Sequence, residues 1–366
     1  MNSAQDALDF LGIDYVEFYV SNARQAAHFY RSTLGLNPIA YAGLETGLRD
    51  RACYVLQRRD VRFVFTAPLL PDHPISAHLA RHGDSVKDIA LRVRNAAAAY
   101  AAALRNGATG VCEPTSFEDA GGRVVKATIA AYGDTVHSFI ERDGYEGPFL
   151  PGFQLIERQA PVPDTGIFAI DHIVGNVEAG AMDRWVAFYR DVLGFKQLVH
   201  FDDRDIATDY SALMSKVMQN GGGKIKFPIN EPAEGRRKSQ IAEYLEYNGG
   251  PGVQHIALST SDICATVDAL RAAGIPFITV PAAYYDDLER RVGAIDESRQ
   301  ALQERNILVD RDDEGYLLQI FSQPVQDRPT LFIEIIQRKG SQGFGKGNFK
   351  ALFEAIEREQ ARRGNL

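Results

Sequence analysis

The sequence predicts an α+β protein in which one domain occurs twice, followed by an extra C-terminal helix. The chain has 366 residues, a length that suits two domains of roughly 150–180 residues better than one. Strand and helix patterns recur in the same order in the two halves, and repetition on this scale indicates a duplicated domain. The amphipathic stretch at the end lies outside the repeat.

The first pair of matching segments lies 157 residues apart, as Asp14 and Asp171 do. Residues 13–20 and 170–174 have strand patterns. Each is followed by a helical stretch that closes with Leu-Gly, at Gly35 and at Gly194. Glycine in this position is typical of the residue that ends a helix.

The second pair lies 167 residues apart, as Asp88 and His255 do. A drift of ten residues between the two offsets is small enough to fall in loops. The segments of this pair are the strands 84–91 and 251–258 and the helices 95–107 and 262–274. Short alternating strands such as 61–66 and 315–321 follow. Each half is therefore expected to be built from βαβββ units.

We expect a first domain over residues 1–151, a linker over 152–165 and a second domain over 166–366. The linker contains Pro161 and Pro163, which favour an extended chain. After a glycine-rich hinge at 340–347, an amphipathic helix is predicted over 348–362. Its apolar residues recur at helical spacing, and Asn348 is the expected N-cap. These apolar residues are Phe349, Leu352, Phe353 and Ile356.

Composition excludes several classes of protein. The net charge of −8 makes general nucleic-acid binding a poor fit, and no apolar run reaches the ~18 residues of a membrane span. The cysteines Cys53, Cys112 and Cys264 are too far apart for a CxxC metal site, which favours a reducing compartment. Because the N-terminus has no secretory pattern, we expect a cytoplasmic protein.

Three residues are candidate metal ligands. His172 and His255 lie at corresponding strand positions of the second half, and Glu334 lies mid-strand among Phe and Ile. A buried carboxylate is costly unless it is paired or binds a metal. Two imidazoles and one carboxylate form the facial triad of non-haem Fe(II) enzymes. Taken singly, each residue could instead be an ordinary core histidine or a salt-bridged glutamate, so spacing alone leaves both interpretations open.

The first half has Tyr15 and Asp88 where the second half has these two histidines. We therefore expect it to keep the fold without a metal and to serve as a scaffold or a subunit contact. His137 and Glu141 are not expected to replace the missing ligands.

Several motifs resemble the 4-hydroxyphenylpyruvate dioxygenase family of the vicinal oxygen chelate superfamily. They include AIDH at 169–172, KFPINEP at 226–232, GVQHIA at 252–257 and GFGKGNFKALFE at 343–354. The resemblance covers the whole chain and is weaker over residues 1–150. It implies two tandem vicinal-oxygen-chelate domains of paired βαβββ modules forming open β-barrels. It also implies one Fe(II) per chain, held by His172, His255 and Glu334.

The resemblance further implies a pocket for 4-hydroxyphenylpyruvate and O2, with homogentisate and CO2 as products. The implied substrate-binding residues are Ser215, Pro228, Asn230, Gln240, Gln254, Gln319, Phe349 and Phe353. Gln254, Gln319 and Asn348 are expected to take part in catalysis, and the two phenylalanines to sandwich the substrate ring. Members of the family form homo-oligomers, so a homodimer or homotetramer is expected.

Three alternatives remain at this stage. A hydroxymandelate synthase uses the same substrate and iron but oxidises the benzylic carbon; Phe349 and the stretch 227–230 favour the ring-hydroxylating enzyme. A glyoxalase-like lyase or isomerase would use the metal as a Lewis acid, which the long C-terminal helix disfavours. A non-catalytic binding module is disfavoured by three intact ligands.

Overall fold

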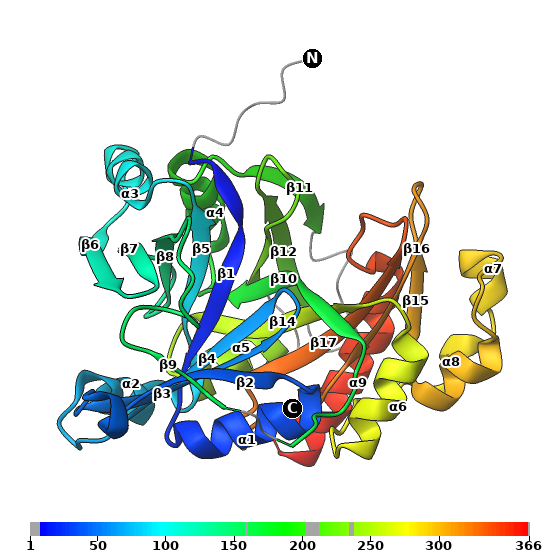
Figure 1. Cartoon of the computed structure of the whole chain (residues 1–366). Coiled ribbons are helices and arrows are strands. Elements are labelled where there is room, and N and C mark those ends of the chain that lie inside the picture. The colour runs from blue at the N-terminus through cyan, green and yellow to red at the C-terminus, as the bar shows by residue number, and fades with distance from the viewer. Residues whose placement is uncertain (1–7, 158–159, 202–211, 234–237, 365–366) are drawn as a thin grey trace.

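Two curled sheets of mixed strands, one from each half of the chain, form the framework of the computed structural model (Figure 1). The structure describes residues 8–157, 160–201, 212–233 and 238–364. The strand order is β6-β7-β8-β5-β1-β4-β3-β2-β9 in the first sheet and β11-β12-β13-β10-β14-β17-β16-β15 in the second. Apart from β9, the two orders are the same pattern read in opposite directions, so the predicted duplication and fold class are confirmed.

The strands of the first sheet are β1 (Phe10–Tyr19), β2 (Asn37–Ala42), β3 (Arg51–Arg58), β4 (Val61–Pro68), β5 (Ser85–Val93), β6 (Gly110–Asp119), β7 (Gly122–Ala130), β8 (Val136–Glu141) and β9 (Gln154–Leu155). Those of the second sheet are β10 (Ile167–Asn176), β11 (Lys196–Phe201), β12 (Ala212–Gln219), β13 (Lys226–Ala233), β14 (Gly252–Thr260), β15 (Leu308–Arg311), β16 (Tyr316–Phe321) and β17 (Phe332–Lys339).

The helices are α1 (Ala23–Leu34), α2 (Pro74–His82), α3 (Ala96–Arg105), α4 (Met182–Ala187), α5 (Gln240–Asn248), α6 (Ile263–Ala272), α7 (Leu288–Val292), α8 (Arg299–Arg305) and α9 (Phe349–Arg362). Each sheet thus contains two βαβββ units, in which α1, α3, α4 and α6 follow the strands β1, β5, β10 and β14.

Local sequence signals set the ends of these helices. Asn95 and Asp262 cap α3 and α6 by accepting hydrogen bonds from the backbone N–H three residues on. Gly35 ends α1 in the left-handed conformation, with φ of 69°, and Gly194 has φ of 72°. A side chain at either position would be strained, so the predicted helix ends are confirmed.

The central strand pairs of the two sheets have the same register. Tyr15 lies opposite Ala90 in β1 and β5, and His172 lies opposite Ala257 in β10 and β14. Both ladders are irregular immediately before these two positions. The correspondence between the halves that the sequence offsets predicted therefore holds residue by residue.

One continuous core joins the two halves. The ring of Phe10 lies edge-on to that of Phe195, with centroids 5.7 Å apart. His137 is fully buried and hydrogen-bonds the Tyr189 hydroxyl at 2.8 Å. Through this contact His137 of the first domain joins Tyr189 of the second.

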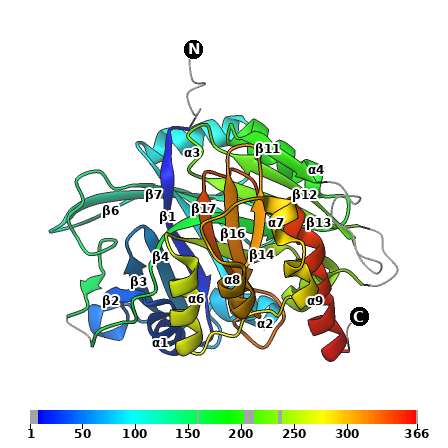
Figure 2. The same cartoon turned by 90° about the vertical axis from the view of Figure 1, so that its right-hand side faces the viewer.

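The C-terminal helix α9 lies alongside the second sheet, whereas the hairpin of β6 and β7 extends away from the first (Figure 2). Leu352 and Phe353 are buried on the sheet side of α9. Asn348 makes no side-chain cap, so the predicted N-cap interaction is wrong. A 3-10 turn over Lys346–Asn348 leads directly into α9, and this turn gives Asn348 helical rather than extended backbone angles.

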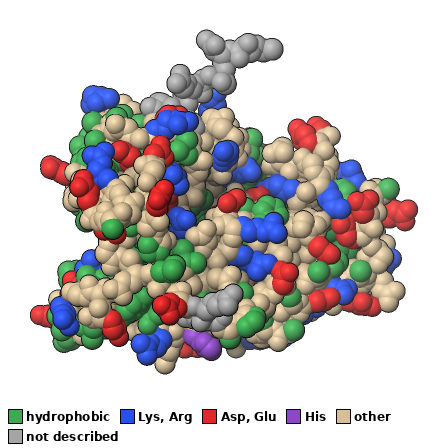
Figure 3. All heavy atoms as spheres, viewed as in Figure 1, with side chains coloured by type: hydrophobic (Ala, Val, Ile, Leu, Met, Phe, Trp, Pro, Cys, Tyr) green, Lys and Arg blue, Asp and Glu red, His purple; other side chains and the backbone are tan. Residues whose placement is uncertain are grey.

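Three further features relate to the expectations from composition: the surface charge, the cysteines and the absence of a membrane-spanning helix among the described residues. Lys and Arg side chains are mixed with Asp and Glu over the face seen in Figure 3. The three cysteines are free. Within the described ranges, no helix is long and apolar enough to cross a membrane.

Candidate metal centre and substrate cavity

His172, His255 and Glu334 come together at one point of the second sheet. They lie on the adjacent strands β10, β14 and β17. Nε2 of His172 and Nε2 of His255 each lie 3.2 Å from the same Oε2 of Glu334. Two donors that bind one ion at about 2.1 Å, with angles of 90–109°, are about 3.0–3.4 Å apart. The spacing therefore fits a bound metal ion.

The sheet explains why these three side chains converge. The register shift before His172 turns its side chain to the inner face of β10. Parallel pairing of β14 with β17 then sets Glu334 opposite Ala257. All three ligand candidates are buried, with exposed fractions of 9% or less.

Each imidazole is oriented by a partner on its other nitrogen. Nδ1 of His172 lies 2.8 Å from Oδ1 of Asp171, and Nδ1 of His255 lies 3.0 Å from Oε1 of Gln254. An acceptor at Nδ1 fixes the proton there and leaves the lone pair of Nε2 for a metal. Arg338 holds Asp171 with two hydrogen bonds of 2.7 and 2.8 Å.

The electrostatics of the cluster favour an ionised carboxylate. Burial alone would raise the pKa of Glu334, but the two imidazoles outweigh it and lower the pKa to about 2. Burial lowers the pKa of His255. Burial also acts against a charged His172, yet Glu334 and Asp171 outweigh it and raise its pKa. An anionic oxygen between two imidazoles is a strong position for a cation.

Aromatic rings enclose the two histidines. Phe332 stacks on His255 with centroids 4.7 Å apart, and Phe344 lies edge-on to His172 at 5.1 Å. Such walls keep water away from the donors and strengthen their interaction with a cation.

A cavity opens from the three candidate ligands toward α9. Seven of the eight predicted substrate-binding residues line it, namely Ser215, Pro228, Asn230, Gln240, Gln254, Phe349 and Phe353. Phe349 and Phe353 come from α9, Gln240 from the start of α5, and the others from β12, β13 and β14. The structure thus brings together residues that are up to 138 positions apart in the chain.

Gln319 and Asn348 are not among the residues that line this cavity. The amide nitrogen of Gln319 is buried and has no hydrogen-bond partner among the described residues, and its side chain lies against the backbone of Gly345. The amide oxygen of Asn348 accepts a hydrogen bond of 2.6 Å from the Tyr284 hydroxyl. The catalytic roles of Gln319 and Asn348 therefore stay predictions, since neither residue is part of the cavity lining.

Asp171, Arg338, Phe332 and Phe344 were not identified from the sequence. Asp171 is adjacent to His172, and Arg338 lies four residues after Glu334. Charged residues beside predicted ligands on apolar strands could have marked both as members of the site. The contact between Asp171 and Arg338, which are 167 positions apart, has no signal in the sequence.

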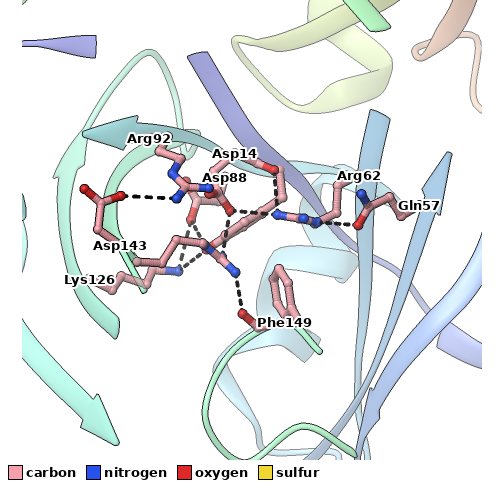
Figure 4. A network of polar contacts seen from close by, with 10 residues as sticks. Asp14, Gln57, Arg62, Asp88, Arg92, Lys126, Asp143 and Phe149 are labelled. Atoms are coloured by element: carbon pink, nitrogen blue, oxygen red, sulfur yellow. Dashed lines mark hydrogen bonds and ion pairs between the residues drawn. The ribbon is translucent and has the colours of Figure 1, made fainter. Parts of the chain in front are cut away.

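The corresponding position in the first sheet has a different set of residues. Tyr15 and Asp88 replace the histidines, and Ser138 stands where Glu334 does, because β8 pairs with β5 as β17 pairs with β14. The ammonium of Lys126 lies 2.8 Å from the Tyr15 hydroxyl and 3.1 Å from Asp88 Oδ2. Figure 4 shows Lys126 reaching Asp88 within a wider polar network.

Comparisons with known proteins agree with this geometry. A family model described as Hydroxyphenylpyruvate dioxygenase, HPPD, N-terminal matches residues 5–171. A second model, the Glyoxalase/Bleomycin resistance protein/Dioxygenase superfamily, matches residues 169–320. The chain is 49% identical to a 4-hydroxyphenylpyruvate dioxygenase of Yarrowia lipolytica, covering 98% of this chain and 94% of that one.

The chain belongs to the 4-hydroxyphenylpyruvate dioxygenase family. A family member from Caenorhabditis elegans is 48% identical over 98% of this chain and 94% of its own length. A similar solved structure is a mutant 4-hydroxymandelate synthase from Streptomyces coelicolor. It is 35% identical with a TM-score of 0.86, covering 97% of this chain and 99% of that one. The expected resemblance is therefore confirmed, and the dioxygenase family is a metal-dependent one.

Proposed function

We propose that this protein converts 4-hydroxyphenylpyruvate and O2 to homogentisate and CO2, with one Fe(II) per chain held by His172, His255 and Glu334. The observation that supports this most is the buried triad, which opens directly onto a cavity with two phenylalanines in its wall. Membership of the dioxygenase family supplies the substrate class.

The triad suits a 2-oxo acid. His172, His255 and Glu334 would supply only three protein ligands, so a bound ferrous ion could also take the carboxylate and keto oxygens of the substrate and O2. Ferrous iron, when bound there, supplies the electrons that activate O2 for decarboxylation and ring oxidation. Asp171 and Gln254 keep Nε2 of each histidine unprotonated and aimed at the ion.

The aromatic end of the substrate fits the opposite side of the cavity. Phe349 and Phe353 are one helical turn apart on α9 and both face inward. They can contact the substrate ring from α9 and hold it against the metal side of the cavity. Because Phe353 of α9 packs in one cluster with Val217 of β12 and Ile241 of α5, α9 also excludes water from the reacting atoms.

Uncharged polar groups line the remaining wall. Ser215, Asn230 and Gln240 can hydrogen-bond the phenol or keto oxygens without adding a charge. Asn230 is already placed by Asn176, whose amide oxygen accepts from it at 3.4 Å. These groups orient the substrate, whereas the ligand set binds the reacting end.

The second candidate function is 4-hydroxymandelate synthesis, which the 35% identical solved structure brings into consideration. Both reactions consume O2 and release CO2, so oxygen uptake does not separate them. Two aromatic side chains from α9 over the ring favour attack on the ring rather than on the benzylic carbon. We therefore place ring hydroxylation first.

Product analysis tests the proposal. The purified chain is incubated with Fe(II), O2 and 4-hydroxyphenylpyruvate, and the products are separated by chromatography. Homogentisate in amounts equal to the CO2 released is the expected result. 4-Hydroxymandelate as the main product, or no oxygen uptake by the iron-loaded chain, would contradict it.

Two other expectations stay predictions. A homodimer or homotetramer in solution and a cytoplasmic location both rest on the resemblance and the composition alone.

A further inference from the structure

A second group of possible metal ligands lies in the first half of the chain, away from the cavity described above. His78 and His82 are four residues apart on α2, so both project from one face of the helix. Asp134, in the turn between β7 and β8, faces them. One nitrogen of each histidine and a carboxylate oxygen of Asp134 lie within 4.8 Å of one another.

His82 has the same bonding pattern as the two candidate iron ligands. Its Nδ1 lies 2.5 Å from the backbone oxygen of Asn248, which can only accept a hydrogen bond, so Nδ1 carries the proton. Its Nε2 lies 2.7 Å from Oδ2 of Asp134. A protonated ring satisfies that contact, and a divalent ion between Nε2 and the carboxylate would replace the proton.

A cavity of about 10 Å³ lies where α2 meets the second half of the chain, and its wall includes His78, His82, Asp134 and Asn248. This is roughly the space of one water-sized sphere, so a bound ion would take the place of a single water molecule. The two imidazole rings have centroids 4.5 Å apart and are tilted by 46°, an arrangement in which both can reach one ion. The 2.7 Å contact needs to lengthen by a few tenths of an ångström for a tetrahedral ion.

Two cationic side chains contact Asp134, and one of them, Arg81, competes for its carboxylate. The guanidinium of Arg81 lies 3.3 Å from its Oδ2, and Lys87 donates to its backbone oxygen. The carboxylate is only half-buried, with an exposed fraction of 47%, so its ion pair with Arg81 is weak. An ion that also binds two imidazoles has the advantage over a single guanidinium.

We propose that His78, His82 and Asp134 form a second metal site, for a borderline divalent ion of the zinc class, at the junction of the two domains. Two imidazoles and one carboxylate are a common ligand set for zinc, with water in the fourth position. None of the three residues belongs to the cavity around His172, His255 and Glu334. The site therefore binds its ion independently of turnover.

Zinc titration of four variants separates the two sites. Calorimetry with zinc chloride alone should give two ions per wild-type chain, one for His78→Ala, one for Glu334→Ala and none for the double variant. His28→Ala, which alters an exposed histidine on α1, is the matched control and should keep two. Two ions in His78→Ala, or one in the wild type that Glu334→Ala removes, would overturn the proposal.

A second variant is needed because His78→Ala could lose zinc simply by misfolding. Arg81→Gln removes the competing guanidinium, so zinc binding in the Glu334→Ala background should tighten by up to about fivefold. A misfolded chain cannot produce this result. Unchanged or weaker zinc binding in Arg81→Gln would contradict the assigned ligands.

Discussion

The two halves of the molecule have the same support around different central residues. In the first sheet, Arg142 donates to Asp14 Oδ1 at 2.7 Å. In the second, Arg338 donates to Asp171 Oδ1 at 2.8 Å. Asp14 and Asp171 are the residues immediately before Tyr15 and His172 on the matching strands. The Asp–Arg pair is thus present whether or not a histidine follows it.

The aromatic ring beside this pair is repeated as well. The guanidinium of Arg142 lies 5.2 Å from the Phe149 ring, and that of Arg338 lies 5.4 Å from the Phe344 ring. Phe149 is edge-on to Tyr15 at 5.2 Å, as Phe344 is to His172 at 5.1 Å. The Asp–Arg–Phe group therefore occurs in both domains, and the two halves differ in the residues at its centre.

At the centre of the first half, the ammonium group of Lys126 provides the positive charge. Lys126 contacts both Tyr15 and Asp88, the residues that replace the two histidines. Lys126 itself stands at the position of Gln319 in the second half, because β7 and β16 pair in the same register with their neighbours. A buried carboxylate needs a cation, and here the chain supplies its own.

The halves also differ in how the cavity is covered. The first sheet encloses a hollow of about 540 Å³ beside Tyr15 and Lys126. The corresponding cavity of the second sheet measures about 70 Å³, because Phe349 and Phe353 of α9 extend into it. The second domain thus differs from the first by three candidate ligands and one added helix.

The largest expected effect comes from the carboxylate ligand. Glu334→Gln should lower oxygen uptake by more than about 100-fold, since even partners behind the ligands change metal affinity or activity by 10–100-fold. Ser138→Ala alters the matching residue of the first half and should leave uptake at the wild-type rate. Uptake is measured with an oxygen electrode. Equal losses in both variants would break the distinction between the halves.

The paired arginines should separate stability from metal binding. Arg142→Gln and Arg338→Gln each leave a buried aspartate without its main partner, so each should lower the free energy of unfolding by about 3–5 kcal/mol. Only Arg338→Gln should also weaken metal binding, by about 10–100-fold. Urea unfolding and a metal titration are the two measurements. Weaker metal binding in Arg142→Gln would contradict this account.

Lys126 tests the internal cation. Lys126→Met leaves Asp88 buried without its positive partner, which should lower the free energy of unfolding by about 1–3 kcal/mol. The double variant with Asp88→Asn should recover much of this loss, because the amide needs no counter-charge. Urea unfolding of both variants is the check. Turnover per folded molecule should stay unchanged, and a stable single variant would exclude the proposed role.

The smallest expected effect concerns the product. Phe349→Ile removes one ring from the cavity wall, so the substrate can tilt and part of the product should change from homogentisate to 4-hydroxymandelate. Leu352→Ile, which keeps an aliphatic side chain in the same wall, is the control. Chromatography that finds only homogentisate at an unchanged rate would exclude a steering role for Phe349.

Repetition made much of this structure predictable from the sequence. The offsets matched Tyr15 with His172 and Asp88 with His255, and the strand register confirms both pairs. Glu334 could be found because a carboxylate is unusual in an apolar strand. The helical spacing of its apolar residues predicted α9 and the face that it turns toward the cavity.

Other parts of the site depend on contacts that sequence patterns do not encode. Asp171 and Arg338 pair across β14, from the first and the last strand of the second sheet in chain order, and Lys126 on β7 reaches Asp88 on β5 across β8. Gln319 is not in the lining of the cavity, and its side chain lies against Gly345, so its expected contact with the substrate stays a prediction. Side-chain direction in such a crowded region follows from tertiary packing rather than from local sequence.

Anomalous diffraction at the iron absorption edge, on crystals of the iron-loaded chain, tests the difference between the halves most directly. One peak is expected, within bonding distance of His172, His255 and Glu334. No peak is expected between Tyr15 and Asp88, where Lys126 lies. A peak at that first-half position, or none at the second-half triad, would contradict this difference between the halves.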